Sequence, residues 1–381
     1  MIRIKQNVIH QMEIEDLVPE NIKQLKPYVA GKTIEEVKNQ YNPAMISKLA
    51  SNENRLGCSK QVKNAVHKAL RDIQDYPDPI SQKLRKKIAA LNGVHEKEVL
   101  ITAGSESLIS VICRTFFLEN EHAITADATF VGFFVQAGVN GIEIKKVPVT
   151  KEYKFDVSGI LNRIDPDTKL VYIANPNNPT GTYLNREEYS HLLENLPDDV
   201  LLIADEAYFE YASNVLDYPN ALDLRRDNVI ILRTFSKAYG LAGLRVGYGI
   251  ANQALIAEMT KTKLTFEPTT LAQAAAYAAL DDTEFIKKSV QSVNKGKETL
   301  YNFFDQQGVH YVRSISNSVL MIMQDEDSAE DFSQSMLEQG VILRRVQAFG
   351  LPHCIRITIG TEAEMHHFEK SFLNITKKIF S

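Results

Sequence analysis

The sequence has few cysteines, no long apolar run and no excess of basic charge. Its cysteines, Cys58, Cys113 and Cys354, are odd in number and widely separated, so they support neither a disulfide framework nor a metal site. No stretch approaches ~18 consecutive apolar residues, the length of a membrane span, and the N-terminus lacks the apolar core of a signal peptide. A net charge of −5 argues against a nucleic-acid binder. We therefore expect a cytoplasmic protein without a metal, a membrane or a nucleic acid as partner.

Short apolar runs alternate with longer stretches that have helical spacing. With 381 residues, 44% of them hydrophobic, the chain can bury a sizeable core and form more than one domain. Alternation of this kind predicts an α/β fold with a mainly parallel sheet, and uninterrupted apolar runs predict strands buried on both faces. The predicted strands are Val99–Thr102, Ala123–Thr125, Leu170–Ala174, Val200–Ala204, Val229–Leu232 and Arg245–Ile250. The predicted helices between them include Glu106–Phe117 and Arg186–Glu194.

The last third of the chain differs from the middle. Thr270–Leu280 is rich in alanine and favours a helix, and the strands Ser318–Met323 and Cys354–Ile359 lie among helical segments. We predict an N-terminal arm and helix over residues 1–48, which packs on the small domain. A large domain follows over residues 49–270, and a smaller α/β C-terminal domain over residues 271–381.

The segment Arg233–Tyr248 (RTFSKAYGLAGLRVGY) carries the strongest chemical signal. Lys237 lies just beyond an apolar strand, where its amine can be shielded from water and condense with an aldehyde. Thr234, Ser236 and Arg245 can supply hydroxyls and a planar guanidinium to a phosphate. A phosphorylated aldehyde cofactor needs this combination, although a lysine can also be simple surface charge.

Asp205 stands at the end of a predicted buried strand, in Leu202–Tyr208 (LIADEAY). It could cap a helix. Alternatively, it could pair with a pyridinium nitrogen and keep that ring protonated as an electron sink. In the second case Tyr208, three residues further on, could reach the phenolic oxygen of the same cofactor.

Two further segments allow both a structural and a functional interpretation. Asn175–Gly181 (NPNNPTG) is composed of turn formers, yet the amide of Asn178 could also donate to the phenolic oxygen. Ala103–Ser107 (AGSES) begins a helical pattern, and a helix N-terminus can either be a plain cap or bind an anion. Because parallel strands end at one edge, Asn175, Asp205 and Arg233 should converge there.

In this order and spacing, the four segments resemble fold-type I enzymes that use pyridoxal 5'-phosphate (PLP), and within them the histidinol-phosphate aminotransferase family. The resemblance runs from about Leu25 to the C-terminus. It also includes LKPYVAGK (25–32), LASNENRLG (49–57), DYPD (75–78), LAQAAA (271–276) and GVILRRVQAFGLPHCIRITIGT (340–361).

The resemblance implies a role for each matching residue. Lys237 would be the internal aldimine lysine that shuttles the 1,3-proton shift, and Asp205 would partner the pyridine nitrogen. Asn178 and Tyr208 would hold the phenolic oxygen. The residues implied in the phosphate cup are Gly104, Ser105, Glu106 (through its backbone), Thr234, Ser236 and Arg245.

Two aromatic residues gain a role only through the resemblance. Phe130, otherwise most simply a core aromatic, would stack on the cofactor ring. Tyr76 would reach the phosphate from the neighbouring subunit, which implies a homodimer with shared active sites.

Four residues are implied at the substrate. Arg356 would bind the acidic end of the substrate, which is a phosphate in histidinol-phosphate enzymes and an α-carboxylate in related aminotransferases. Arg344 would be a second phosphate ligand, although a surface charge is the alternative. A guanidinium suits either anion, so the arginines do not choose between them. Tyr28 and Asn54 match positions near the substrate.

The sequence departs from its relatives in places. Arg55, Cys58 and Ala128 stand where proline is frequent, and Thr265–Thr270 (TFEPTT) lacks the PFNVN-like sequence that is common in relatives. That stretch lies near the substrate mouth in the family, so acidic Glu267 puts the exact substrate in doubt and leaves the cofactor chemistry untouched.

The implied reaction is transamination from histidinol phosphate to 2-oxoglutarate, with Lys237 as base and then acid. Three alternatives stay open. The first is an aromatic amino acid or prephenate aminotransferase with the same machinery. The second is a PLP-dependent phospho-amino-acid decarboxylase, and the third a non-catalytic PLP-binding regulator.

Overall fold

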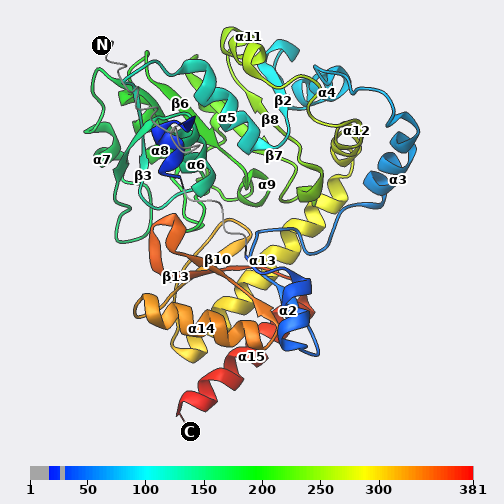
Figure 1. Cartoon of the computed structure of the whole chain (residues 1–381), viewed down its shortest axis with the longest axis vertical. Helices are drawn as coiled ribbons and strands as arrows, with labels where there is room; N and C mark the ends of the chain where they lie inside the picture. The colour runs from blue at the N-terminus through cyan, green and yellow to red at the C-terminus, as the bar shows by residue number, and fades with distance from the viewer. Residues whose placement is uncertain (1–16, 26–30, 381) are drawn as a thin grey trace, which may run out of the picture.

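The computed structural model describes residues 17–25 and 31–380, with side chains through residue 375. The described chain forms two lobes, joined along the long helix α13 (Thr283–Gln307) (Figure 1). Within these described residues, no helix is both long and apolar enough to cross a membrane.

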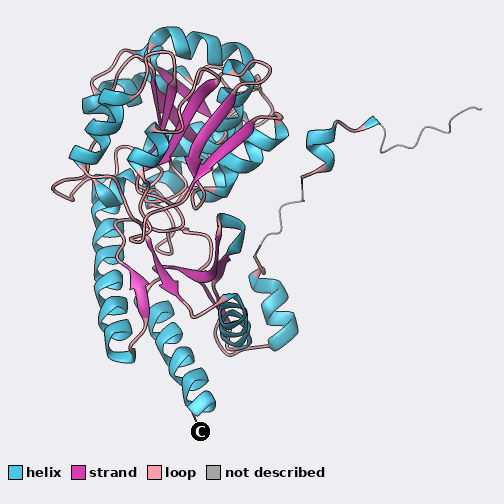
Figure 2. Ribbon diagram, turned by 90° about the vertical axis from the view of Figure 1, so that its left-hand side faces the viewer, coloured by secondary structure: helices cyan, strands magenta, loops and turns pink. Residues whose placement is uncertain are grey.

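A seven-stranded sheet forms the centre of the larger lobe, with helices on both faces (Figure 2). Only β8 runs antiparallel to its neighbours, and the other adjacent pairs are parallel. The strands are, in spatial order, β2 (Val99–Thr102), β8 (Gly247–Ile250), β7 (Val229–Thr234), β6 (Leu201–Asp205), β5 (Thr168–Ala174), β3 (His122–Ala126) and β4 (Glu143–Val147). The fold is therefore the α/β architecture with a mainly parallel sheet that the sequence predicts.

Alternate residues of each central strand enter opposite cores. In β6, Leu202 and Ala204 pack on one face, while Leu201 and Ile203 pack on the other, as a period of two requires. Burial of both faces explains why the strand is apolar throughout. One face is covered by α3 (Lys60–Ala69), α4 (Gln82–Asn92), α7 (Val157–Leu161), α8 (Arg186–Asn195) and α12 (Thr270–Ala279), and the other by α5 (Ser105–Phe116), α6 (Val131–Val139) and α11 (Gln253–Thr262).

The smaller lobe contains an antiparallel sheet with helices packed against it. Its strands, in spatial order, are β12 (Arg344–Val346), β13 (Leu351–Thr358), β10 (Ser318–Ile322) and β9 (His310–Val312). A core separate from those of the large sheet joins this sheet to α13, α14 (Glu326–Glu338) and α15 (Glu362–Phe380). The strands expected from residues 318 and 354 onward are thus both present.

Two N-terminal helices contact different lobes. In α1 (Glu20–Lys23), the amide of Asn21 donates to the carbonyl of Gly138 in α6 at 3.2 Å. In α2 (Ile34–Tyr41), the hydroxyl of Tyr41 accepts a 2.9 Å hydrogen bond from Gln334 of α14. β1 (Ser47–Lys48) then pairs in parallel with β11 (Val341–Ile342), the strand that directly precedes β12 of the smaller lobe.

One predicted strand begins later than expected. The run from Arg245 to Ile250 is extended only from Gly247, because Arg245 adopts a left-handed turn with φ 51°. Arg233, expected just beyond an apolar strand, lies inside β7.

Candidate active site

A cavity of about 220 Å³ opens where β5, β6 and β7 end. Parallel strands present their carboxyl ends, and the loops that follow them, at one edge of a sheet. The lining residues are Ser105, Glu106, Phe130, Ala174, Pro176, Asn178, Asp205, Ala207, Tyr208, Thr234, Ser236, Lys237 and Arg245. The structure therefore brings together the predicted residues from all four sequence segments.

Lys237 follows β7 and is half-buried beside the cavity. Its Nζ donates to the carbonyl of Ser51 at 3.4 Å and lies 5.7 Å from the ring of Tyr208. Burial lowers the pKa of this amine to about 8, and the positive charge of Arg356 acts in the same direction. A lowered pKa leaves more of the amine neutral, which is the form that attacks an aldehyde.

Asp205 is the last residue of β6 and is buried. Its Oδ2 accepts from the Tyr172 hydroxyl at 2.7 Å, and its Oδ1 accepts from the Ala207 amide at 3.1 Å. Burial raises the pKa of the carboxyl to about 6, against the lowering effect of the Tyr172 bond. The short helix that follows, α9 (Phe209–Ala212), is preceded by Tyr208 at its N-cap, so the helix-cap interpretation of Asp205 is wrong.

Asn178 and Tyr208 line the cavity from neighbouring loops. The Tyr208 hydroxyl accepts a 2.8 Å hydrogen bond from Asn52, and burial raises its pKa. The Oδ1 of Asn178 accepts from Arg356 Nη1 at 2.5 Å. An amide has one acceptor end and one donor end, so the Nδ2 end of Asn178 is the one that can donate to a ligand oxygen.

Hydroxyls, a guanidinium and a helix N-terminus meet at one end of the cavity. The N-terminus of α5 begins at Ser105, after Gly104 at φ 91°. A Cβ on Gly104 would stand 2.9 Å from Nη2 of Arg245, so a larger residue there would push this guanidinium away from its position beside the helix. Arg245 Nη1 donates to Ser236 Oγ at 3.4 Å, and Thr234 Oγ1 donates to the same oxygen at 3.0 Å. This cluster fits a phosphate group.

A second cavity of about 400 Å³ continues from the first and shares Lys237 and Asn178 with it. Arg344 of β12 and Arg356 of β13 line it and are direct cross-strand partners. Their guanidinium carbons lie 5.7 and 5.5 Å from the centre of the Phe349 ring. The smaller lobe thus places two positive charges at the cavity that contains the lysine.

Tyr76 and Asn54, both predicted at the site, line neither cavity in the described part of the chain. Tyr76 is 81% exposed and stacks on Phe266 with 4.4 Å between ring centres. Asn54 instead donates to the carbonyl of Ala238 and to the Ser289 hydroxyl, both at 2.8 Å. Tyr28 lies outside the described residues.

The structure adds residues that sequence reasoning missed. Asn52, two positions before Asn54, lines the second cavity and binds Tyr208. Ser51 and Phe349 also line it. Asn52 has a left-handed φ of 54°, and the only signal for it in the sequence is the family resemblance of the surrounding segment LASNENRLG.

The unusual 265–270 stretch lies against the start of α5. The carboxylate of Glu267 accepts from the Ser107 hydroxyl at 3.0 Å, and its backbone carbonyl accepts from Lys263 at 2.8 Å. The acidic side chain of Glu267 therefore contacts the first turn of α5 through Ser107. Ser107 lines neither cavity.

Comparison with known proteins gives a consistent result. Residues 44–372 match the family model "Aminotransferase class I and II". The chain is 44% identical over 342 residues to a histidinol-phosphate aminotransferase of Geobacillus sp. (strain WCH70), covering 89% of this chain and 93% of that relative. It is 41% identical to the corresponding protein of Bacillus subtilis (strain 168), over 91% of this chain and 96% of that one.

A solved structure agrees with this result. The histidinol-phosphate aminotransferase from Sinorhizobium meliloti, crystallised in complex with pyridoxal-5'-phosphate, superposes with a TM-score of 0.86 at 27% identity. The match covers 95% of this chain and 98% of that one. The fold is that of a fold-type I aminotransferase. The chain belongs to the class I and II aminotransferases and, within them, to the histidinol-phosphate aminotransferase family.

Proposed function

We propose that this enzyme uses PLP to transfer the amino group of histidinol phosphate to 2-oxoglutarate. The observation that carries the choice of substrate is the pair of arginines, Arg344 and Arg356, that faces the cavity next to Lys237. The cofactor follows from the family and from the fit of the site.

The residues at the first cavity match the parts of PLP. Arg245, Thr234, Ser236 and the N-terminus of α5 would hold its phosphate, and Phe130 would cover one face of its ring. Asp205 would face the ring nitrogen, whose positive charge would bring the raised carboxyl pKa down again. Gly104, Ser105 and Glu106 would complete the phosphate cup through their backbone. When bound, PLP supplies a ring that accepts the electrons released as the donor loses its α-proton.

Lys237 would carry the proton between two atoms. Its amine would act as the base that removes the proton from the substrate α-carbon and, once protonated, as the acid that gives the proton back. A group whose pKa is about 8 can both accept and release a proton near neutral pH. Asn178 and Tyr208 would hold the ring oxygen and thereby fix the ring in front of the amine.

Two guanidinium groups favour a phosphate over a carboxylate. Like charges directly opposite each other on neighbouring strands repel, and a dianion between Arg344 and Arg356 would offset that repulsion. A planar guanidinium also matches the oxygens of a phosphate. An α-carboxylate, as in an aromatic amino acid, carries one charge and would satisfy Arg356 alone. The second arginine therefore favours the phosphorylated donor. Tyr28 and Asn54 stay proposed substrate residues by family match.

Replacing Arg344 by alanine tests this choice. We expect kcat/KM for histidinol phosphate to fall roughly 100-fold, the order expected for loss of a charge-assisted contact, while histidinol without the phosphate loses little. Arg345→Ala is the matched control, because Arg345 is the next residue on β12 and pairs instead with Glu326 and Glu330 of α14. Equal losses for the two donors would contradict a phosphate role for Arg344.

We further propose a homodimer in which Tyr76 completes the site of the partner. The support within this chain is that Tyr76 is 81% exposed and lies outside its own cavity.

We propose a division into an arm over residues 1–48, a large domain over 49–270 and a small domain over 271–381, on the basis of the two sheets and their separate cores. A cytoplasmic location is proposed because Cys58, Cys113 and Cys354 are all free thiols.

A further inference from the structure

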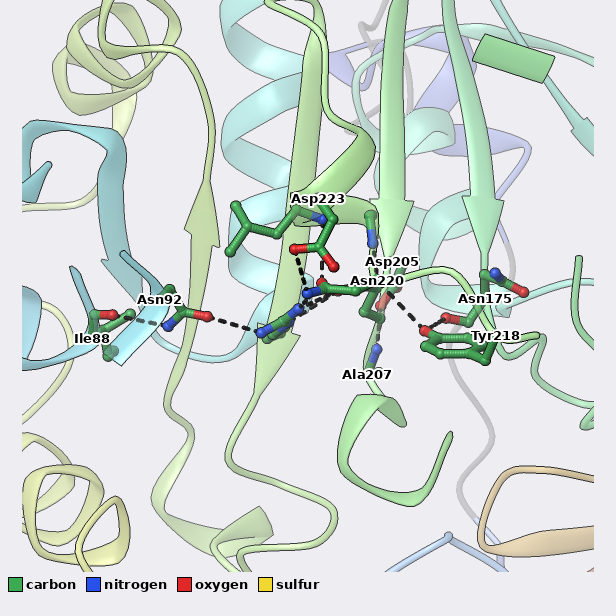
Figure 3. Close-up of polar contacts among 12 residues, drawn as sticks. Ile88, Asn92, Asn175, Asp205, Ala207, Tyr218, Asn220 and Asp223 are labelled. Atoms are coloured by element: carbon green, nitrogen blue, oxygen red, sulfur yellow. Dashed lines mark hydrogen bonds and ion pairs between the residues drawn. The ribbon is translucent and has the colours of Figure 1, made fainter. Parts of the chain in front are cut away.

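A buried polar network lies behind the cavity and joins the carboxyl ends of β5, β6 and β7 and the loops that follow them. Figure 3 shows it extending from Asn92 through Asn220 to Tyr218 and Asn175, beside Asp205. These strand ends and loops carry groups at the cavity, among them Asn178, Asp205 and Lys237. Glu206, Tyr218 and Arg233 make the central contacts of the network. None of these three residues lines either cavity in the described part of the chain.

An ion pair between Glu206 and Arg233 forms the centre of the network. Nε and Nη2 of Arg233 donate to Glu206 Oε2 at 2.9 and 2.8 Å, and the side chains are 4% and 1% exposed for Arg233 and Glu206. Arg233 also donates to Asn92 at 3.0 Å and to Asn220 at 2.8 Å, and it lies 3.5 Å from the Phe209 ring. Removing either partner would leave the other as an unpaired buried charge, so breaking the pair is strongly destabilising.

The remaining oxygen of Glu206 extends the network to the β5 loop. Oε1 accepts from the backbone amide of Ala221 at 2.9 Å and lies 3.5 Å from the oxygen of the Tyr218 hydroxyl. The same hydroxyl donates to the carbonyl of Asn175 at 2.6 Å. Asn175 stands three residues before Asn178, Glu206 follows Asp205, and Arg233 precedes Thr234. Each contact therefore falls within three residues of a group at the cavity.

We propose that Tyr218, Glu206 and Arg233 are positioning residues, which set these strand ends and loops, and hence Asn178, Asp205 and Lys237, at fixed separations around the cofactor. The inference rests on the proposed use of PLP. The network also limits charge, because Arg233 neutralises the carboxylate that is the direct neighbour of Asp205. Asp205 then presents the acidic charge to the ring nitrogen without competition from Glu206.

Tyr218→Phe is the mildest test, because it removes one hydroxyl and keeps the packing of the ring against Tyr183 and Phe209. Tyr189→Phe is the matched control: Tyr189 is another buried tyrosine of the larger lobe, and its hydroxyl has no hydrogen-bond partner among the described residues. PLP affinity of the cofactor-free protein and the pH midpoint of the visible absorbance of the loaded protein are measured for both.

We expect Tyr218→Phe to weaken PLP binding roughly tenfold, the scale of one buried hydrogen bond. The pH midpoint should rise by about half a unit. A less well placed Asn178 leaves more negative charge on the ring oxygen, and the nearby lysine nitrogen then keeps its proton to higher pH. Tyr189→Phe should change neither quantity.

Arg233→Lys provides a second arm, because lysine keeps the charge and loses the two-pronged contact. Its control is Arg225→Lys, which alters an arginine–glutamate pair with Glu98 at 2.6 Å whose residues line neither cavity. We expect a tenfold or larger loss of PLP affinity for Arg233→Lys alone. If Arg233→Lys does not fold, the Tyr218 pair decides.

The outcomes distinguish the positioning role of the network from the proposed function of the protein. A wild-type protein that binds no PLP would contradict the proposed function itself. A wild-type protein that binds PLP, with Tyr218→Phe equal to Tyr189→Phe in affinity and in pH midpoint, would overturn the positioning role and leave the function standing.

Discussion

At the scale of single residues, burial brings two ionisable groups of the site toward neutrality. It lowers the pKa of Lys237 from 10.5 to about 8 and raises that of Asp205 from 3.8 to about 6. Both shifts have the same first cause, since removal from water disfavours the charged form of either group. More of the Lys237 amine is therefore neutral, and so reactive, than in an ordinary lysine.

The lowered pKa of Lys237 predicts how cofactor capture depends on pH. The reactive form is the neutral amine, so the rate of PLP capture by cofactor-free protein should rise with pH through a midpoint near 8. Stopped-flow absorbance would measure this rate. A midpoint near that of an ordinary lysine, about 10.4, would contradict the account.

Lys237→Ala serves as the control for that rate. The variant should show no lysine-bound cofactor absorbance at any pH, because it has no amine to condense at this place. Turnover should fall by several orders of magnitude, as expected when the base and the covalent anchor are lost together. Full turnover by this variant would remove Lys237 from the mechanism.

Residue types at motif spacing made part of the site predictable. Lys237, Asp205 and Asn178 stand in short segments whose chemistry can be interpreted locally, and all three line the cavity. Asn52 could not be found this way, because its role depends on a 2.8 Å contact with a residue 156 positions away. Arg233 was expected to converge with them and instead pairs with Glu206 behind the cavity.

At the scale of elements, the N-terminus of α5 shows why a turn residue has a chemical role. Gly104 combines a φ of 91° with a 2.9 Å approach of its would-be Cβ to Arg245. The first constraint requires glycine because a side chain would strain the backbone, and the second means that a larger residue would displace the guanidinium. The segment AGSES indicates a helix start in the sequence, but the arginine beside it comes from a segment 140 residues later.

Gly104→Ala should weaken PLP binding roughly tenfold or more, because the new methyl group displaces the guanidinium from the phosphate position. Strain should also cost about 1–2 kcal/mol of stability. Gly93→Ala is the control: Gly93 also has a positive φ, 64°, but nothing lies within 4 Å of its would-be Cβ. It should lose stability and keep its PLP affinity. Equal affinities for the two variants would refute the role of Gly104.

The predicted strands were confirmed where the pattern was strongly apolar, as in Leu170–Ala174, which lies within β5. The prediction failed at Arg245, where valine and tyrosine nearby suggested an extended start. A left-handed turn at that residue, which carries its guanidinium toward α5, overrides the local preference. The backbone conformation of Arg245 thus determines where β8 begins.

At the scale of the whole molecule, the site depends on both lobes. Arg344 and Arg356 belong to the small sheet, yet Arg356 reaches Asn178 of the large lobe at 2.5 Å. Periodicity identifies the two strands but cannot say where their side chains point relative to Lys237. Only the resemblance placed these arginines at the substrate, and the packing of the lobes brings them to the cavity.

A mixing experiment tests whether Tyr76 serves the partner subunit. Lys237→Ala and Tyr76→Ala proteins, each weakly active, are unfolded and refolded together in equal amounts. If sites are shared, half of the dimers are hybrids with one intact site, so activity should recover to roughly a quarter of wild type. Absence of recovery, with hybrids shown by mass spectrometry to form, would mean that Tyr76 acts in its own chain.

The central claim, a PLP-dependent transfer from histidinol phosphate, is tested most directly on the wild-type enzyme. The measurement is kcat/KM for glutamate formation from 2-oxoglutarate, with histidinol phosphate and with phenylalanine as donors, and with CO₂ release followed in parallel. Two arginines facing one dianion predict a preference for histidinol phosphate of about 100-fold or more, without CO₂. An equal or higher value for phenylalanine, or CO₂ release without consumption of 2-oxoglutarate, would contradict it.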